Sequence, residues 1–355
     1  MDEYYMKRCL ELAGKGIGSS RPNPMVGCVI VCREQIIGEG YHRAYGEAHA
    51  EVNAIASVRN PGLLAESTLY VNLEPCSHFG KTPPCAGLIL ENRIPRVVVG
   101  TADPNPVVGG KGLKHLEENS TEVQRGILEA ECIDLNKRFF TYHEKKRPWI
   151  LLKWAQTEDG FIDIRRGDSD TEGVNWITGM EARQWVHKWR SEEQAILVGT
   201  RTAMLDNPEL TVRDWEGENP LRVVIDRKGI LPGHLKIFND EADTLVFTSA
   251  LKSDHGRVRY IEVPPGQDYL EAILRTLYES EISSIMVEGG AQLLNSFIDS
   301  GLWDEARVFT GRKKFGTGLP APTLSADPVR KLNAGNDLLE IYKQSHATNR
   351  AFNGS

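Results

Sequence analysis

One histidine, two cysteines and one glutamate stand at spacings typical of a metal site with a catalytic role. The sequence His49-Ala50-Glu51 is followed by Pro75-Cys76 and by Pro84-Cys85. Imidazole and thiolate are ligands that Zn²⁺ prefers, and three protein ligands leave the fourth tetrahedral position open for water. The set therefore predicts a catalytic zinc ion bound by His49, Cys76 and Cys85, with Glu51 as the catalytic acid and base.

The predicted reaction follows from these parts. Zinc lowers the pKa of a bound water to about 7, which gives hydroxide at neutral pH. Glu51 would take that proton and pass it to a ring nitrogen and then to departing ammonia. The pattern H-x-E followed by P-C-x-x-C is the signature of zinc-dependent nucleobase deaminases. The sequence thus predicts hydrolysis at an amino-bearing ring carbon of a pyrimidine or purine, although eight residues separate the two cysteines here.

The start of a helix must hold the histidine and the glutamate. Residues two apart on a helix point in nearly opposite directions. His49 and Glu51 should therefore both project from the first turn of a helix predicted over 48–58.

The two cysteines stand at the ends of further predicted elements. Cys76 follows a buried strand predicted over 68–73, and Cys85 opens a helix predicted over 86–93. The positive end of a helix lowers the pKa of a thiol and favours metal binding. The remaining cysteines are predicted to be core residues, namely Cys9, Cys28, Cys32 and Cys132.

The rest of the sequence alternates between predicted strands and helices, which indicates two α/β domains. In the first half, the further elements are a helix over 1–15, strands over 26–32, 35–39 and 96–100, and a helix over 127–142. In the second half, strands cover 150–155, 195–199, 222–226, 244–248, 284–287, 306–310 and 339–343, and helices cover 181–190, 269–279 and 291–300. The charged segment 144–148 predicts a boundary between domains over 1–146 and 147–355.

The second half lacks a G-x-G-x-x-G motif after a strand, so a Rossmann dinucleotide site is unsupported. Val287-Glu288-Gly289-Gly290 instead runs from a predicted strand into the helix over 291–300. Glycines at such a junction let backbone amides and a helix N-terminus approach a cofactor phosphate. By itself, a pair of glycines more often only makes a turn.

Composition and charge restrict the possible partners. A hydrophobic content of 40% and a charged content of 26% are ordinary for a globular protein. The net charge is −7 and no long basic run occurs, so no nucleic-acid partner is expected. No apolar run approaches the ~20 residues that span a bilayer, and the N-terminus lacks a signal-peptide pattern, so no membrane partner is expected. Six cysteines in 355 residues do not suggest a disulfide framework, which predicts a cytoplasmic location.

The long segment Glu74–Cys85 resembles one branch of the zinc deaminases, the bifunctional deaminase/reductases of riboflavin biosynthesis. Further matches to that family are spread along the chain and comprise 21–29, His42, 103–106, 153–160, 176–179, 206–213 and 287–290. The resemblance covers about residues 1–345 and joins two unrelated domains in the family's order. That combination is more specific than any single motif.

The resemblance implies a cytidine-deaminase-like α/β/α domain followed by a dihydrofolate-reductase-like α/β domain. The first would deaminate 2,5-diamino-6-ribosylamino-4(3H)-pyrimidinone 5′-phosphate to the corresponding uracil. The second would reduce the ribosyl side chain to ribityl. The implied cofactors are one Zn²⁺ per deaminase site and NADPH. The implied partner is this small phosphorylated pyrimidine, and a homo-oligomer (dimer or tetramer) is expected.

The resemblance also assigns residues to the two sites. Asn23 and His42 would hold the pyrimidine and sugar in the deaminase, and His78 and Lys81 of the enlarged loop would bind the same substrate. The residues assigned to NADPH are Ala155, Trp176, Thr202, Asp206, Gly290, Ala291, Gln292, Leu293, Leu294, Asn295 and Ser296. Those assigned to the reductase substrate are Lys153, Asp159, Arg190, Leu210, Arg213 and Glu288. The two arginines are expected at its phosphate, through charge-assisted hydrogen bonds.

Two positions and one segment depart from the family pattern, all in the second half. Val174 stands where a substrate-contacting serine is expected, and Thr157 stands where serine is usual. The segment 311–316 is more basic than expected and lacks the usual proline. These departures weaken individual reductase contacts and leave the domain assignment intact.

Two other functions stay open at this point. The first domain could be a cytidine or tRNA adenosine deaminase whose second half recruits substrate. The long loop between the cysteines and the net charge of −7 argue against it, because RNA binding needs a basic surface. Alternatively, the zinc could be structural in a binding protein, but this leaves the three-ligand set and the nearby Glu51 unexplained.

Overall fold

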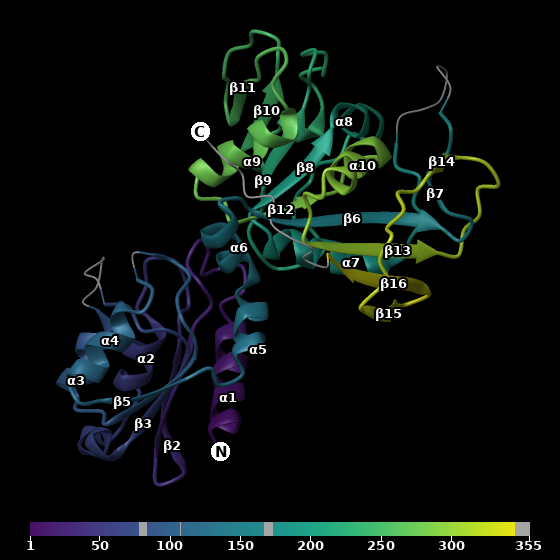
Figure 1. Cartoon of the computed structure of the whole chain (residues 1–355). Coiled ribbons are helices and arrows are strands. Elements are labelled where there is room, and N and C mark those ends of the chain that lie inside the picture. Colours follow the sequence, from purple (N-terminus) through teal and green to yellow (C-terminus); the bar gives the residue numbers. More distant parts are fainter. Residues whose placement is uncertain (78–83, 107, 167–172, 345–355) are drawn as a thin grey trace. The chain divides into compact units, whose positions relative to one another are not determined.

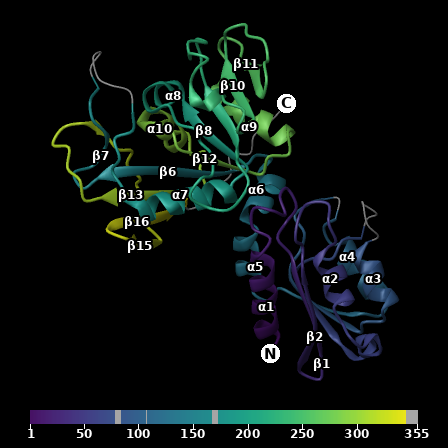
Figure 2. The ribbon, with the colours of Figure 1, turned by 180° about the vertical axis from the view of Figure 1, so that it is seen from behind.

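The computed structural model describes residues 1–77, 84–106, 108–166 and 173–344. The chain divides into two compact units, Met1–Lys146 and Arg147–Ser355 (Figure 1 and Figure 2). Each unit is built around its own sheet. Within the described residues, no helix combines the length and the apolar character needed to cross a membrane.

The first unit contains a five-stranded sheet in the order β2-β1-β3-β4-β5. Its strands are β1 (Gly27–Cys32), β2 (Gln35–Tyr41), β3 (Thr68–Leu73), β4 (Arg96–Thr101) and β5 (Glu122–Arg125). Its helices are α1 (Asp2–Gly14), α2 (Ala50–Ala56), η1 (Pro61–Glu66), α3 (Cys85–Glu91), α4 (Lys111–Glu118), α5 (Glu129–Leu135) and α6 (Lys137–Lys145). Strand β1 is antiparallel to β2 and β3, whereas β3, β4 and β5 are parallel.

Helices cover both faces of this sheet, which explains why its strands are so apolar. Side chains alternate between faces along a strand. In β1, Cys28 and Ile30 therefore join a core with α2, α3 and α4, while Val29 and Val31 join a second core with α1 and α5. Figure 1 shows these two groups of helices on opposite sides of the sheet. The sheet thus fixes α2 and α3, which carry the predicted metal ligands.

The strands predicted over 26–32, 35–39 and 68–73 are confirmed, but the single helix predicted over 127–142 is wrong. The chain forms two helices, α5 and α6, that meet at Asn136. The Asn136 side chain is buried, accepts a hydrogen bond from Met25 N at 2.8 Å and donates one to Met25 O at 2.9 Å. This long-range pairing interrupts the helical pattern, and the local sequence gives no sign of it.

Gly40 in β2 lets α2 pack directly on the strand. A Cβ atom on Gly40 would lie 2.4 Å from Ala54 N and 2.5 Å from Ala50 O. We expect Gly40→Ala to lower the free energy of unfolding by about 1–3 kcal/mol, as overpacking does, in calorimetry or denaturant titration. Gly14→Ala is the matched control, because a Cβ there meets nothing within 4 Å. Equal stabilities of the two variants would contradict this account.

The second unit contains a nine-stranded sheet in the order β11-β10-β9-β8-β12-β6-β13-β16-β15. Its strands are β6 (Trp149–Thr157), β8 (Ala195–Gly199), β9 (Leu221–Ile225), β10 (Thr244–Thr248), β11 (Val258–Glu262), β12 (Ser284–Val287), β13 (Glu305–Gly311), β15 (Arg330–Ala334) and β16 (Asp337–Lys343). Strands β7 (Phe161–Asp163) and β14 (Leu319–Pro320) form a separate pair. The helices are α7 (Met180–Glu192), α8 (Thr200–Asp206), η2 (Lys236–Phe238), α9 (Tyr269–Glu279) and α10 (Ala291–Asp299).

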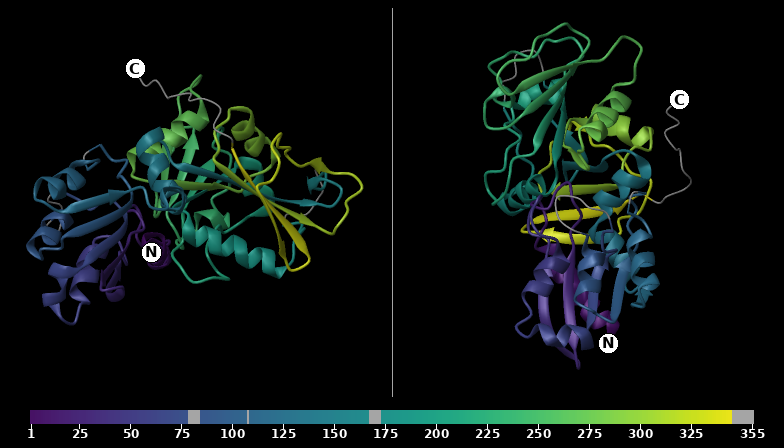
Figure 3. Two further views of the ribbon diagram at one scale, coloured as in Figure 1. Left: turned by 60° about the horizontal axis from the view of Figure 1, so that its bottom comes forward. Right: turned by 90° about the vertical axis from the view of Figure 1, so that its left-hand side faces the viewer.

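This sheet is parallel except at one edge, where the C-terminal strands, yellow in Figure 3, pair antiparallel. One core packs α9 and α10 on the sheet, and a second core packs α7 and α8. All seven strands and three helices predicted here exist. Helix α8 and strands β7, β11, β14 and β15 were not predicted, because they are short or exposed at the sheet edge and carry little apolar periodicity.

Candidate active sites

Three potential metal ligands from distant parts of the first unit lie together. His49 is the residue before α2, Cys76 follows β3, and Cys85 is the first residue of α3. His49 Nδ1 lies 3.3 Å from Cys85 Sγ and 3.6 Å from Cys76 Sγ, and the three ligand atoms lie within 4.8 Å of one another. Ligand atoms around one tetrahedral zinc ion are held about 3.5–4 Å apart. The cluster therefore fits Zn²⁺ in size and in ligand type.

Hydrogen bonds make this cluster ready for a cation. The Cys85 backbone N–H donates to Cys76 Sγ at 3.3 Å, which places one thiol at the start of α3. A hydrogen bond from the Cys85 thiol, together with His49, outweighs burial and lowers the pKa of Cys76 well below its usual range. This favours the thiolate form of Cys76, which is the form that binds zinc.

Glu51 lies in the first turn of α2 and is only 3% exposed. Burial and the nearby Cys76 raise the pKa of Glu51 to about 7. A carboxyl group with a pKa near neutrality can both accept and return a proton at low cost. The structure thus places a carboxyl group with a near-neutral pKa beside the three potential metal ligands, outside the ligand set itself.

His42 and Asn23 form a polar pair next to the cluster. His42 Nδ1 lies 3.2 Å from Ala48 O, and its Nε2 lies 3.2 Å from Asn23 Nδ2. Because a carbonyl oxygen only accepts, Nδ1 carries the proton and Nε2 accepts from Asn23. Burial lowers the pKa of His42, and its ring meets His49 edge-on at 5.6 Å. The other two residues expected in this site, His78 and Lys81, lie outside the described residues.

Glu74, two residues before Cys76, fixes the backbone next to the cluster, and the sequence did not predict this role. Its carboxylate accepts backbone hydrogen bonds from Gly110 N at 2.9 Å and from Gly112 N at 3.0 Å, with longer ones from Asp103 N and Leu113 N. This ties the chain just before Cys76 to the start of α4. An acidic residue directly after a buried strand was the only signal in the sequence.

The second unit contains a cleft of about 900 Å³ at the carboxyl ends of β6, β8, β9 and β12. Parallel α/β sheets bind ligands at this edge. Most of the residues predicted for the second site line the cleft, namely Lys153, Ala155, Trp176, Arg190, Thr202, Asp206, Leu210, Arg213, Glu288, Gly290, Ala291, Gln292, Leu293 and Ser296. The structure therefore gathers the two predicted sets, for cofactor and substrate, in one place.

Three of the predicted residues do not line the cleft. Both Leu294 and Asn295 belong to α10. Leu294 points into the core and is fully buried, whereas Asn295 lies on the exposed side of the helix. The Asp159 carboxylate instead accepts hydrogen bonds from Thr157 Oγ1 at 2.6 Å and from Gly316 N at 2.7 Å. Asp159 thus holds the turn after β6 against the segment after β13.

A buried ion cluster forms the floor of the cleft. Arg190 donates to both Glu288 oxygens, from Nε at 3.0 Å and from Nη2 at 2.8 Å, and Lys153 Nζ lies 3.8 Å from Glu288 Oε2. Burial opposes ionisation of Glu288, but Arg190 and Lys153 outweigh it and lower the pKa of Glu288 to about 2. Burial lowers the pKa of Lys153, and Glu288 counteracts this. Glu288 therefore favours the charged form of the partly buried Lys153.

At the junction between β12 and α10, the backbone packs closely against the end of β8. A Cβ on Gly289 would lie 2.8 Å from Gly199 N, and Gly290 N donates to Thr202 Oγ1 at 2.8 Å.

Arg166 and Asp206 form an ion pair that lines the same cleft. Arg166 Nη2 donates to Asp206 Oδ1 at 2.8 Å, while burial raises the pKa of Asp206 to about 6. Arg166 was not predicted, because only its fold neighbours show that it faces the cleft.

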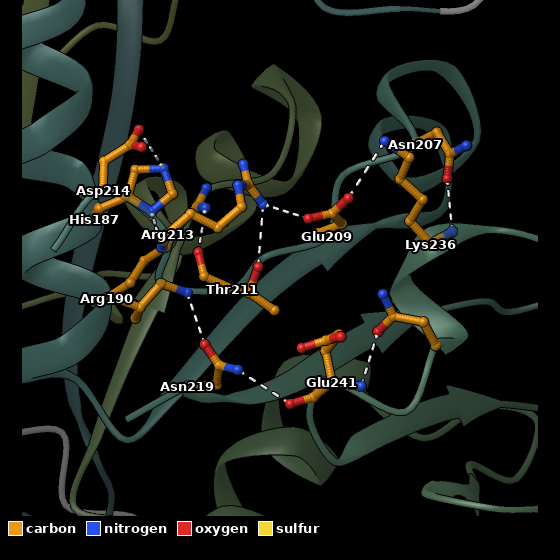
Figure 4. Close-up of polar contacts among 12 residues, drawn as sticks. His187, Arg190, Asn207, Glu209, Thr211, Arg213, Asp214, Asn219, Lys236 and Glu241 are labelled. Carbon is orange, nitrogen blue, oxygen red and sulfur yellow. Dashed lines mark hydrogen bonds and ion pairs between the residues drawn. The ribbon is translucent and has the colours of Figure 1, made fainter. Parts of the chain in front are cut away.

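A second unpredicted residue, His187, orders the segment 209–213 (Figure 4). Burial, with Arg190 and Arg213, lowers the pKa of His187 to about 4, so its ring is neutral. Its Nδ1 then accepts the Arg213 backbone N–H at 3.1 Å. In the same segment Leu210 is buried with a positive φ of 56°, a conformation that a leucine adopts only when its surroundings impose it.

Comparison with known proteins decides what these two sites belong to. Residues 1–101 match the cytidine and deoxycytidylate deaminase zinc-binding region, and residues 148–336 match the RibD C-terminal domain. The riboflavin biosynthesis protein RibD of Aquifex aeolicus is 40% identical, over 97% of this chain and 99% of that protein. The chain belongs to the RibD family. It is a bifunctional enzyme of riboflavin biosynthesis, with a zinc-dependent deaminase domain and an NADPH-dependent reductase domain.

Other RibD proteins agree over the same length. The RibD of Escherichia coli is 37% identical, over 89% of each chain. The crystal structure of a diaminohydroxyphosphoribosylaminopyrimidine deaminase/5-amino-6-(5-phosphoribosylamino)uracil reductase from Thermotoga maritima is 41% identical, with a TM-score of 0.86, and covers 97% of this chain and 99% of that one. An Acinetobacter baumannii RibD structure gives a TM-score of 0.85 at 33% identity, covering 96% and 98%. The predicted fold class, both activities and both cofactors are confirmed.

Proposed function

We propose that the RibD-family chain acts on the two substrates named for its Thermotoga maritima relative. The first domain would hydrolyse the amino group of the diaminopyrimidinone ribosyl phosphate, and the second would reduce the ribosyl group of the resulting uracil. The observation that carries the proposal is the full-length similarity to that enzyme, with both sites assembled on one chain.

In the deaminase, the chain's own residues would bind the ring and move protons. Bound zinc supplies an activated water, and His49, Cys76 and Cys85 would hold the ion. Glu51 would take a proton from that water and deliver it to the ring nitrogen, then to the leaving amine, so that water and the amine become the new carbonyl oxygen and ammonia. The proposal is supported by the burial of Glu51 and by its raised pKa.

In the reductase, Lys153 would hold the proton that the reduction requires. Bound NADPH would supply a hydride to C1′ of the ribosyl group. As the bond between C1′ and the ring oxygen breaks, Lys153 would donate a proton from Nζ to that oxygen, so that one hydride and one proton convert ribosyl to ribityl. The support is its place on the cleft floor, beside Glu288. The backbone N–H groups at the start of α10 would face a cofactor phosphate.

We also propose that the protein works in the cytoplasm as a homo-oligomer. Six free cysteines suit a reducing compartment. Sedimentation analysis tests the oligomeric state, and a monomer at working concentration would contradict this part.

The two steps can be separated by removing the metal. We expect the diaminopyrimidinone phosphate to gain about one mass unit with the zinc enzyme alone, and the product to gain about two more when NADPH is added. After chelation of zinc, ammonia release should stop while NADPH oxidation with the deaminated substrate persists, because no described residue of the cleft belongs to the metal cluster. Mass spectrometry and NADPH absorbance provide the readouts. Chelation that stops both activities would contradict two independent sites.

A further inference from the structure

Arg190 is already occupied by other parts of the protein. Its Nε and Nη2 donate to Glu288, and its Nη1 donates to Thr211 O at 3.2 Å. All three nitrogens of the guanidinium therefore have partners, and its side chain is only 10% exposed. A phosphate in the cleft would need another cation beside Arg213.

Lys236 is such a cation, and it is joined to Arg213 by Glu209 (Figure 4). Arg213 Nη1 donates to Glu209 Oε2 at 2.8 Å, and Lys236 Nζ lies 3.4 Å from Glu209 Oε1. One carboxylate thus bridges two cations, Arg213 from the segment after α8 and Lys236 from the start of η2. All three residues line that cleft.

Further hydrogen bonds hold the two cations in position. The Lys236 N–H donates to Asn207 Oδ1 at 2.8 Å, and Arg213 Nη1 also donates to Thr211 Oγ1 at 3.1 Å. The two cations have side-chain exposures of 47% and 57%, whereas Glu209 is 29% exposed. The cations can therefore reach a ligand from solvent while the carboxylate keeps them together.

We propose that Lys236 and Arg213 together bind the phosphate of the reductase substrate, and that Glu209 competes with that phosphate for the same two cations. A phosphate dianion carries more charge than a carboxylate and offers three acceptor oxygens, so it replaces Glu209 when substrate enters. The inference rests on the proposed function, since that substrate carries the phosphate. It adds Lys236 as a binding residue and makes Glu209 a residue that sets substrate affinity.

The test is steady-state reduction of the deaminated phosphate with NADPH. Lys236→Met should raise the KM for this substrate about tenfold with kcat nearly unchanged, because it removes one charge-assisted hydrogen bond. Its KM for the dephosphorylated substrate should not change. Glu209→Gln should lower the KM for the phosphorylated substrate, since the competing charge is gone. Lys331→Met is the matched control, because Lys331 is 60% exposed and pairs with Glu340 outside the cleft.

Each other outcome overturns a stated claim. If the unsubstituted protein does not reduce the phosphorylated uracil, the proposed function is wrong. If it does, but Lys236→Met leaves the KM unchanged, only this inference is wrong. A rise in the KM for NADPH alone would assign the cation pair to the cofactor phosphate instead. A rise in substrate KM for Glu209→Gln would remove the competition and leave Glu209 a positioning role.

Discussion

Replacing Glu51 by alanine should abolish ammonia release while bound zinc stays near one ion per chain. The side chain is 3% exposed and its pKa is raised to about 7 by burial and by Cys76, so it can exchange protons at neutral pH. General acid–base groups contribute about 10²–10⁴-fold to rates. Because Glu51 would serve both the attack and the departure, we expect a loss at the upper end, at least about 10³-fold in kcat.

The same protein supplies the control for this experiment. NADPH oxidation with the deaminated substrate should be unchanged in Glu51→Ala, which shows that the reductase unit has folded, while bound zinc shows that the deaminase unit has. Glu51→Gln keeps the size of the side chain and removes only its ability to carry a proton, so it should be as inactive. Zinc is counted by metal analysis of the purified variants. Retained ammonia release would exclude Glu51 as the proton carrier, and loss of zinc would make it a structural residue.

The group of potential zinc ligands could be predicted because its residues lie in short, chemically unusual motifs. His49 and Glu51 are two residues apart, and each cysteine stands next to a proline at the end of a predicted element. The strand before Cys76 is mostly apolar and almost entirely buried, as is typical of a strand covered on both faces. Glu74 escaped prediction because its four partners come from 103–113, about 30 to 40 residues later.

The reductase cleft depended more on family resemblance than on physical pattern. Lys153 and Glu288 lie 135 positions apart in the sequence, and only the parallel pairing of β6 with β12 brings them together. Likewise, Arg166 and His187 carry no motif, and their roles follow from what the fold places against them. Asp159 shows the reverse situation, since it belongs to a recognisable motif but turns towards the backbone of Gly316.

Glu288→Gln should reduce the reductase kcat/KM by about 100-fold and leave ammonia release unchanged. The substitution keeps the shape of the side chain but leaves Lys153 and Arg190 without their shared counter-ion in a buried place. Removing one member of a buried ion pair typically lowers the free energy of unfolding by about 3–5 kcal/mol, because the remaining charge is uncompensated. Glu340→Gln is the matched control, as it breaks the ion pair with Lys331 outside the cleft.

The pH dependence of this variant separates a chemical role from a structural one. Glu288 favours the charged form of Lys153, while burial and Arg190 lower the pKa of Lys153. If Lys153 donates a proton, the rate must fall as pH rises through the pKa of Lys153. Without the Glu288 charge that pKa drops further, so the alkaline limb of kcat should move to lower pH in Glu288→Gln. A lower rate with an unshifted limb would mean that Glu288 only holds Arg190 and the substrate in place, and that the proton comes from another donor.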